Sequence, residues 1–164
     1  MNASIRDASP HDTPFLKAML YEAAYWRPGQ PRPPIDTALA DPELAKLLAN
    51  WGNNGDVGVI AVSEDAEPIG AAWYRFWTDD HHSYGYVDAA TPEIAIGVVH
   101  EWRGYGVGRA LLEALIERAR SANVGTLSLS VERDNPALRL YERMGFVTVG
   151  SLDNAWTMTL TLND

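Results

Sequence analysis

The sequence predicts an α/β protein of the α+β type, with a mixed, mostly antiparallel sheet flanked by helices. Three observations support this class: short apolar segments separated by turn residues, helical apolar spacing in a few longer stretches, and one strand–helix–strand unit around residues 93–131. That unit predicts a parallel strand pair, whereas the short connections predict antiparallel neighbours. The expected order is β-α-α-β-β-β-α-β-α-β-β, within a single domain over residues 1–164.

The first part of the chain predicts one strand and two helices. Residues 3–7 are expected to form the strand. Ser9 is expected to cap the first helix, with Pro10 at its first position and Asp12 completing a capping box. The apolar stripe of this helix consists of Phe15, Leu16, Met19, Leu20 and Ala23. After a proline-rich loop, a second helix is expected through Leu44, Leu47, Leu48 and Trp51.

The rest of the chain predicts six strands and two helices. A hairpin turn and a long polar connection separate the first three of these strands. The expected strands are 57–63, 69–77, 93–99, 126–131, 146–152 and 156–162, and the expected helices are 107–120 and 136–144.

A glycine-rich segment, Arg103-Gly104-Tyr105-Gly106-Val107-Gly108-Arg109, joins the 93–99 strand to the helix that follows it. The free N–H groups at a helix N-terminus favour a phosphate group, and glycines allow the backbone to approach it closely. The segment therefore predicts a phosphate-binding loop, with a flexible surface turn as the alternative. It does not match a Walker loop, because Arg109-Ala110 stands where Lys-Ser/Thr is needed. The glycine spacing also departs from the dinucleotide fingerprint.

Two motifs resemble the GNAT N-acetyltransferase superfamily. Arg103, Gly106 and Gly108 fit its acyl-CoA loop, Arg/Gln-x-x-Gly-x-Gly/Ala. About 30 residues later, the segment 135–146 resembles its second signature, with Asn, Leu-Tyr-Glu and Gly-Phe in the same order. The resemblance covers residues 56–162 and implies a GNAT-like fold. It also implies an enzyme that moves the acetyl group of acetyl-CoA to a primary amine by direct attack.

The resemblance implies how acetyl-CoA would bind. The backbone N–H groups of residues 103–108 would hold the pyrophosphate, and a bulge near Gly97 would open the strand so that the pantetheine pairs with it. Arg103 could bind phosphate or form a surface salt bridge, and His100, where many relatives carry proline, is expected in a surface loop. The expected cofactor-binding residues are Val98, Val99, His100, Arg103, Gly104, Tyr105, Gly106, Val107, Gly108, Arg109 and Asn135.

Tyr141 is the residue that the resemblance implies as general acid for the leaving thiolate. Its alternative role is packing, because Ala137, Leu140, Tyr141 and Met144 form an apolar stripe at helical spacing. Asn135 is expected to cap this helix, with Pro136 at its first position. The backbone N–H of Val98 would face the oxyanion.

Glu93, at the start of the central strand, is the first choice for the base that deprotonates the amine; its alternative role is a strand-end charge facing water. Glu132, Asp88, His81, His82 and a chain of water molecules are the other candidates. No metal is expected, because His81 and His82 lack a carboxylate at helical ligand spacing.

The expected acceptor is a small-molecule or peptide amine, and a cationic one is favoured. Its pocket would be built from the first two helices, the polar connection and the last hairpin. Aromatic side chains could form a cation–π wall, with Asp79, Asp80 and Asp88 nearby. The aromatic candidates are Tyr25, Trp26, Trp51, Trp77, Tyr84, Tyr86 and Trp156.

The charge and composition of the chain restrict its partners. A net charge of −9 argues against nucleic-acid binding, and no apolar run has the length of a membrane span. The absence of cysteine and of a signal-like N-terminus leads us to expect a cytoplasmic protein. The last hairpin could supply a homodimer edge. A non-catalytic acyl-CoA-binding regulatory module is the main alternative to an enzyme, and a nucleotide-phosphate protein is a second.

Overall fold

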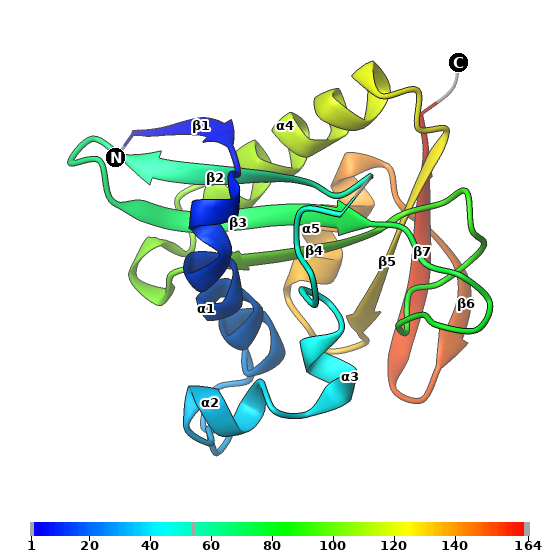
Figure 1. The fold of residues 1–164 in the computed structure, drawn as a ribbon, viewed down its shortest axis with the longest axis horizontal. Helices are drawn as coiled ribbons and strands as arrows, with labels where there is room; N and C mark the ends of the chain where they lie inside the picture. The colour runs from blue at the N-terminus through cyan, green and yellow to red at the C-terminus, as the bar shows by residue number, and fades with distance from the viewer. Residues whose placement is uncertain (1, 54, 163–164) are drawn as a thin grey trace.

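The strands form one seven-stranded sheet in the order β1-β2-β3-β4-β5-β7-β6 in the computed structural model, which describes residues 2–53 and 55–162 (Figure 1). All neighbours pair antiparallel except β4 and β5, which are parallel. The strands are β1 (Ala3–Asp7), β2 (Val57–Ser63), β3 (Pro68–Arg75), β4 (Glu93–Val98), β5 (Thr126–Glu132), β6 (Val147–Leu152) and β7 (Ala155–Thr161). The predicted fold class is confirmed.

Helices cover both faces of this sheet. One face packs against α1 (Thr13–Ala24), and the short helices α2 (Ile35–Ala38) and α3 (Pro42–Ala45) follow α1 in the chain. The other face carries α4 (Val107–Ser121) and α5 (Ala137–Met144). Figure 1 shows α1 and α4 on opposite sides of β2 and β3. Because the inner strands are covered on both sides, successive residues of β2 such as Val59, Ile60 and Ala61 are all fully buried.

The beginning of the first helix differs slightly from expectation. Asp12 Oδ2 accepts the Ser9 N–H at 2.7 Å, as expected for a capping box. The first turn is a 3-10 helix, Pro10–Asp12, so that α1 begins at Thr13.

The predicted second helix is wrong beyond Ala45, where α3 ends and turns follow. Side chains of β3 take the carbonyl groups that a continuing helix would use: Trp73 Nε1 donates to Leu47 O at 3.3 Å and Arg75 Nη1 to Lys46 O at 3.0 Å. The apolar periodicity of this segment instead reflects packing, because Leu48 is buried in the core between α1 and the sheet.

The parallel strands β4 and β5 pair only at the start of β4 and then diverge. Their register consists of the single pair Glu93↔Ser128. The expected divergence of the two strands is therefore present, but the expected bulge near Gly97 is not: β4 pairs with β3 without a shift from Glu93 to Val98. Gly97 has a different role, because a Cβ there would lie 2.3 Å from the carbonyl oxygen of Met19 in α1.

We expect Gly97→Ala to destabilise the fold by about 1–3 kcal/mol, because the added methyl group forces α1 away from the sheet. Thermal unfolding measures the effect as a midpoint lowered by several degrees. Gly150→Ala in β6 is the matched control, since a Cβ there meets nothing within 4 Å. Equal midpoints for the two variants would contradict a close contact between α1 and Gly97.

Candidate active site

A cleft of about 910 Å³ lies at the gap between β4 and β5. Its walls come from the end of α1, from β4 and β5, from the glycine-rich turn before α4, and from α5. Glu93 and Tyr141 both line it, from β4 and α5. The cleft therefore brings together the two residues predicted for catalysis and most of those predicted for acetyl-CoA.

The free edge of β4 presents backbone groups to this gap. The Val99 N–H donates to Ile69 O of β3 at 2.9 Å. Because peptide groups alternate in direction along a strand, the N–H groups of Ile96 and Val98 point the other way, toward β5. The Val98 carbonyl points there too, and accepts a hydrogen bond from Arg103 Nε at 3.1 Å. The Val98 N–H thus has the direction required of an oxyanion donor.

The glycine-rich turn leaves the N-terminus of α4 without a side-chain cap. A 3-10 turn, His100–Trp102, follows β4, and Gly104 and Gly106 then take left-handed conformations with φ of 84° and 83°. A Cβ at either glycine would meet nothing within 4 Å, so the conformation, and not crowding, favours glycine here. The uncapped N–H groups of the first turn can donate hydrogen bonds to an anion.

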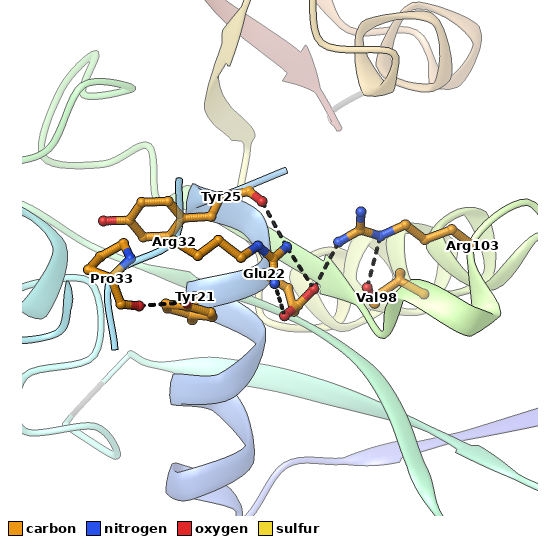
Figure 2. Close-up of polar contacts among 7 residues, drawn as sticks. All are labelled: Tyr21, Glu22, Tyr25, Arg32, Pro33, Val98 and Arg103. Atoms are coloured by element: carbon orange, nitrogen blue, oxygen red, sulfur yellow. Dashed lines mark hydrogen bonds and ion pairs between the residues drawn. The ribbon is translucent and has the colours of Figure 1, made fainter. Parts of the chain in front are cut away.

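Arg103 adopts the salt-bridge alternative. Its Nη2 lies 3.2 Å from Glu22 Oε1 of α1, while its Nε is bound to Val98 O. Glu22 also pairs with Arg32 at 3.1 Å, so that one carboxylate holds two arginines from distant segments (Figure 2). Sequence reasoning missed Glu22, because nothing local indicates a partner for Arg103.

Of the other predicted residues of the turn, Val107 is buried in the core, whereas Tyr105 and Arg109 are exposed. Arg109 pairs with Glu113 at 2.9 Å one helical turn along α4, and the exposed Tyr105 ring packs edge-on against Trp102. His100 is exposed, as expected.

Tyr141 packs in the hydrophobic core and also lines the cleft. It is 7% exposed, and its ring packs edge-on against Phe146 with centroids 5.9 Å apart. Burial raises the pKa of Tyr141 well above its usual range, so the phenol is protonated at neutral pH. Asn135 Oδ1 accepts the Ala137 N–H at 2.9 Å and so caps α5, which begins one residue later than expected.

Glu93 is buried, so the alternative of a strand-end charge facing water is wrong. Trp77 Nε1 donates to Glu93 Oε1 at 3.0 Å, and the Gly85 N–H also donates to the carboxyl group. Burial raises the pKa of Glu93 to about 7, and the two hydrogen bonds oppose this shift. Sequence reasoning missed Gly85 and regarded Trp77 only as an aromatic candidate for the acceptor pocket.

The other candidate bases lie in exposed or paired positions. Asp88 caps a turn through the Ala90 N–H at 2.9 Å, and Glu132 pairs with Arg27 at 2.7 Å. His82 stacks on Tyr86, with ring centroids 4.3 Å apart, and His81 is exposed beside Trp77. Within residues 2–53 and 55–162, no group of three or more His, Asp or Glu side chains could hold a metal ion.

A smaller chamber of about 320 Å³ shares part of its wall with the cleft. Trp26, Tyr84, Glu132 and Asp153 line it, and the Tyr84 hydroxyl donates to Asp153 Oδ2 at 3.0 Å. Of the remaining aromatic candidates, Trp51 packs against Trp73 in the core and Trp156 lies under Arg133. The lining of this chamber is therefore aromatic and acidic.

An open β4–β5 pair followed by a glycine-rich turn at a helix N-terminus is the arrangement expected of an acyltransferase that binds acyl-CoA by its pyrophosphate. A sequence model of the acetyltransferase (GNAT) family matches residues 19–146. The chain belongs to this family. It is an acetyl-CoA-dependent N-acetyltransferase, and acetyl-CoA is its cosubstrate.

Individual relatives agree with this assignment. The L-methionine sulfoximine/L-methionine sulfone acetyltransferase of Pseudomonas aeruginosa is 33% identical over 161 residues, which cover 93% of this chain and 84% of that protein. The PaiA N-acetyltransferase of Thermoplasma acidophilum, solved with coenzyme A, has a TM-score of 0.71 at 17% identity, covering 98% and 99% of the two chains. For yncA of Salmonella typhimurium, solved with acetyl-CoA, the TM-score is 0.68 at 24% identity, covering 100% and 96%.

None of the helices in the described part of the chain combines the length and the hydrophobicity that crossing a bilayer requires.

Proposed function

We propose that the protein acetylates a primary amine of a small, cationic acceptor by direct attack on acetyl-CoA, with Glu93 as general base and Tyr141 as general acid. The observation that carries this proposal is that a buried carboxyl group and a buried phenol line the same cleft, where β4 and β5 separate. The N–H groups of residues 104–108 bind the pyrophosphate, and the Val98 N–H stabilises the oxyanion. The Arg103 N–H is already engaged, because it donates to His100 O at 3.2 Å.

Glu93 has the properties of a base for this reaction. An alkylammonium group has a pKa of about 10.4 and must lose a proton before it attacks. A carboxyl group whose pKa is about 7 is partly ionised at neutral pH and is a stronger base than an exposed glutamate. Tyr141 is protonated at the same pH and can give a proton to the leaving thiolate.

The chamber beside the cleft supports a small, cationic acceptor. Asp153 supplies negative charge, and Trp26 and Tyr84 supply aromatic surface. Glu132 also lines the chamber, but it is paired with Arg27, whose guanidinium lies over the Trp26 ring. Curated relatives are named for small acceptors: methionine sulfoximine in Pseudomonas aeruginosa and mycothiol in Nocardiopsis dassonvillei, whose enzyme is 39% identical over 110 residues.

A panel of amines tests the acceptor class through the release of the CoA thiol. We expect the highest kcat/KM for diamines, polyamines or aminosugars, and lower values for methionine sulfoximine and for a peptide N-terminus. A clear preference for the zwitterionic amino acid would contradict the cationic acceptor. Acetyl-CoA binding without thiol release from any amine would instead favour the non-catalytic regulatory module.

Glu93→Gln tests the base. In the wild-type protein, kcat/KM should rise with pH as Glu93 loses its proton, because only the carboxylate accepts the proton of the amine. The variant should lack the limb near pH 7 and lose about 100-fold in kcat/KM at neutral pH. A pH–rate profile identical to that of the wild type would assign the base to another group or to water.

Three further features are part of this proposal. Residues 1–164 form a single acetyltransferase domain, and the acidic protein acts in the cytoplasm without nucleic-acid or membrane partners. A homodimer could form along β6, which is an edge strand that exposes Val147, Val149 and Leu152. Analytical ultracentrifugation measures the oligomeric state directly.

A further inference from the structure

We infer that Trp77 and Gly85, both in the β3–β4 loop (residues 76–92), are positioning residues that hold the Glu93 carboxyl group at the acceptor side of the cleft. The inference rests on the proposed role of Glu93 as the base. It adds two residues to the machinery of the reaction, and neither is expected to touch the acetyl-CoA.

Trp77 provides a fixed donor. Its side chain is buried, and its indole N–H meets Glu93 Oε1 at 3.0 Å. The exposed ring of His81 packs edge-on against the indole, with centroids 5.6 Å apart, at a turn closed by the Thr78↔His81 pairing. An indole N–H can donate a hydrogen bond but cannot accept one, so Glu93 Oε1 is always the acceptor in this contact.

Gly85 provides the second donor at a distance that only glycine allows. A Cβ on this residue would lie 2.7 Å from both Cδ and Oε2 of Glu93, and 2.9 Å from its Cγ. Because no real Cβ contact is this short, any other residue would displace either the loop or the carboxyl group. Gly85 is therefore required for space, and it brings its N–H against the carboxyl group.

Two contacts just before Gly85 in the chain hold the β3–β4 loop in place. Lys46 Nζ, which also pairs with Glu43, donates to His82 O at 2.5 Å. The hydroxyl group of Tyr84 binds Asp153 at 3.0 Å, which joins the loop to the turn between β6 and β7. The two donors consequently have a defined position before any acceptor arrives.

The charged groups around Glu93 leave it without a direct ion pair. Arg75 is its cross-strand neighbour on β3, but its guanidinium binds Asp56 at 3.1 and 2.8 Å. From α1, Glu22 is engaged with Arg32 and Arg103. Lys46 and His82 act on Glu93 only as more distant charges, and its neighbour on β5 is the uncharged Ser128.

Neutral donors suit a base better than an arginine would. An ion pair would hold the pKa of the carboxyl group low, whereas an indole and a peptide N–H orient it while burial keeps the pKa near 7. A carboxylate has about four lone-pair positions, so two donors leave others free for the amine proton. The arrangement fixes the direction of the base without neutralising it.

Two variants test the inference. Trp77→Phe removes one donor to the charged form, so the acidic limb of kcat/KM should move upward by about 1 pH unit. Gly85→Ala should lower kcat about 10- to 100-fold by displacing the carboxyl group, with the KM for acetyl-CoA unchanged. Trp51→Phe and Gly150→Ala are the matched controls, and should keep the wild-type profile and kcat.

Carbon-13 NMR titration of the Glu93 carboxyl group gives a readout that does not need turnover. An upward displacement of its pKa in Trp77→Phe supports the inference. Suppose that Glu93→Gln removes the rise in kcat/KM near pH 7, while Trp77→Phe and Gly85→Ala keep the wild-type pH–rate profile, kcat and Glu93 titration. The positioning role of Trp77 and Gly85 is then overturned, and Glu93 remains the base. If Glu93→Gln keeps the wild-type profile, the proposed base fails, even where the NMR shift occurs.

Discussion

Gly106→Asp is expected to weaken the binding of acetyl-CoA by about 100-fold or more. Gly106 is the residue before α4 and has a φ of 83°, and its N–H group is among those expected to face the pyrophosphate. A carboxylate there repels a pyrophosphate in a partly enclosed site, where charges are screened less than in water. A tenfold loss corresponds to about 1.4 kcal/mol, so repulsion of about 3 kcal/mol suffices. Titration calorimetry with acetyl-CoA measures the loss.

Gly106→Asn separates charge from shape. Asparagine has nearly the size of aspartate and also tolerates left-handed backbone, and a Cβ at this position meets nothing within 4 Å. We expect this variant to lose no more than about tenfold in affinity, because only the strain and bulk remain. Titrations with ATP and NAD complete the comparison. Equal affinities of Gly106→Asp and the wild-type protein for acetyl-CoA would show that the pyrophosphate binds elsewhere.

The parts of the site that sequence could predict are those in which a short segment determines its own structure. The turn from Arg103 to Gly108 is one, because its glycines and the apolar strand before it suffice to indicate a strand, a turn and a helix. The cap of α5 by Asn135 is another. In both, the residues that make the contact lie within a few positions of one another.

The parts that sequence could not predict depend on contacts between distant segments. Arg103 meets Glu22, which is in α1, and the second helix ends where β3 side chains bind its carbonyl groups. Gly97 suggests a bulge when β4 is considered alone, but the structure explains it by the approach of Met19. Glu93 was predicted by position, while its burial depends on a loop that carries no regular pattern.

Tyr141→Phe is expected to lower kcat by about 100-fold and to leave the affinity for acetyl-CoA nearly unchanged. The variant removes only the hydroxyl group, so the edge-on contact with Phe146 and the packing of α5 are kept. The loss falls on the step in which the thiolate leaves, because the protonated phenol is the proposed donor of its proton. Steady-state kinetics gives kcat, and calorimetry gives the dissociation constant of acetyl-CoA.

Tyr74→Phe is the matched control for this result. Tyr74 is buried in the same core, and burial raises its pKa as well, but it is not among the residues that line the cleft. Loss of a buried hydroxyl group alone should therefore leave kcat within about twofold. A large loss confined to Tyr141→Phe assigns the proton transfer to Tyr141. Equal rates for the two variants would leave Tyr141 with a packing role, and the thiolate would then have to leave with a proton from water.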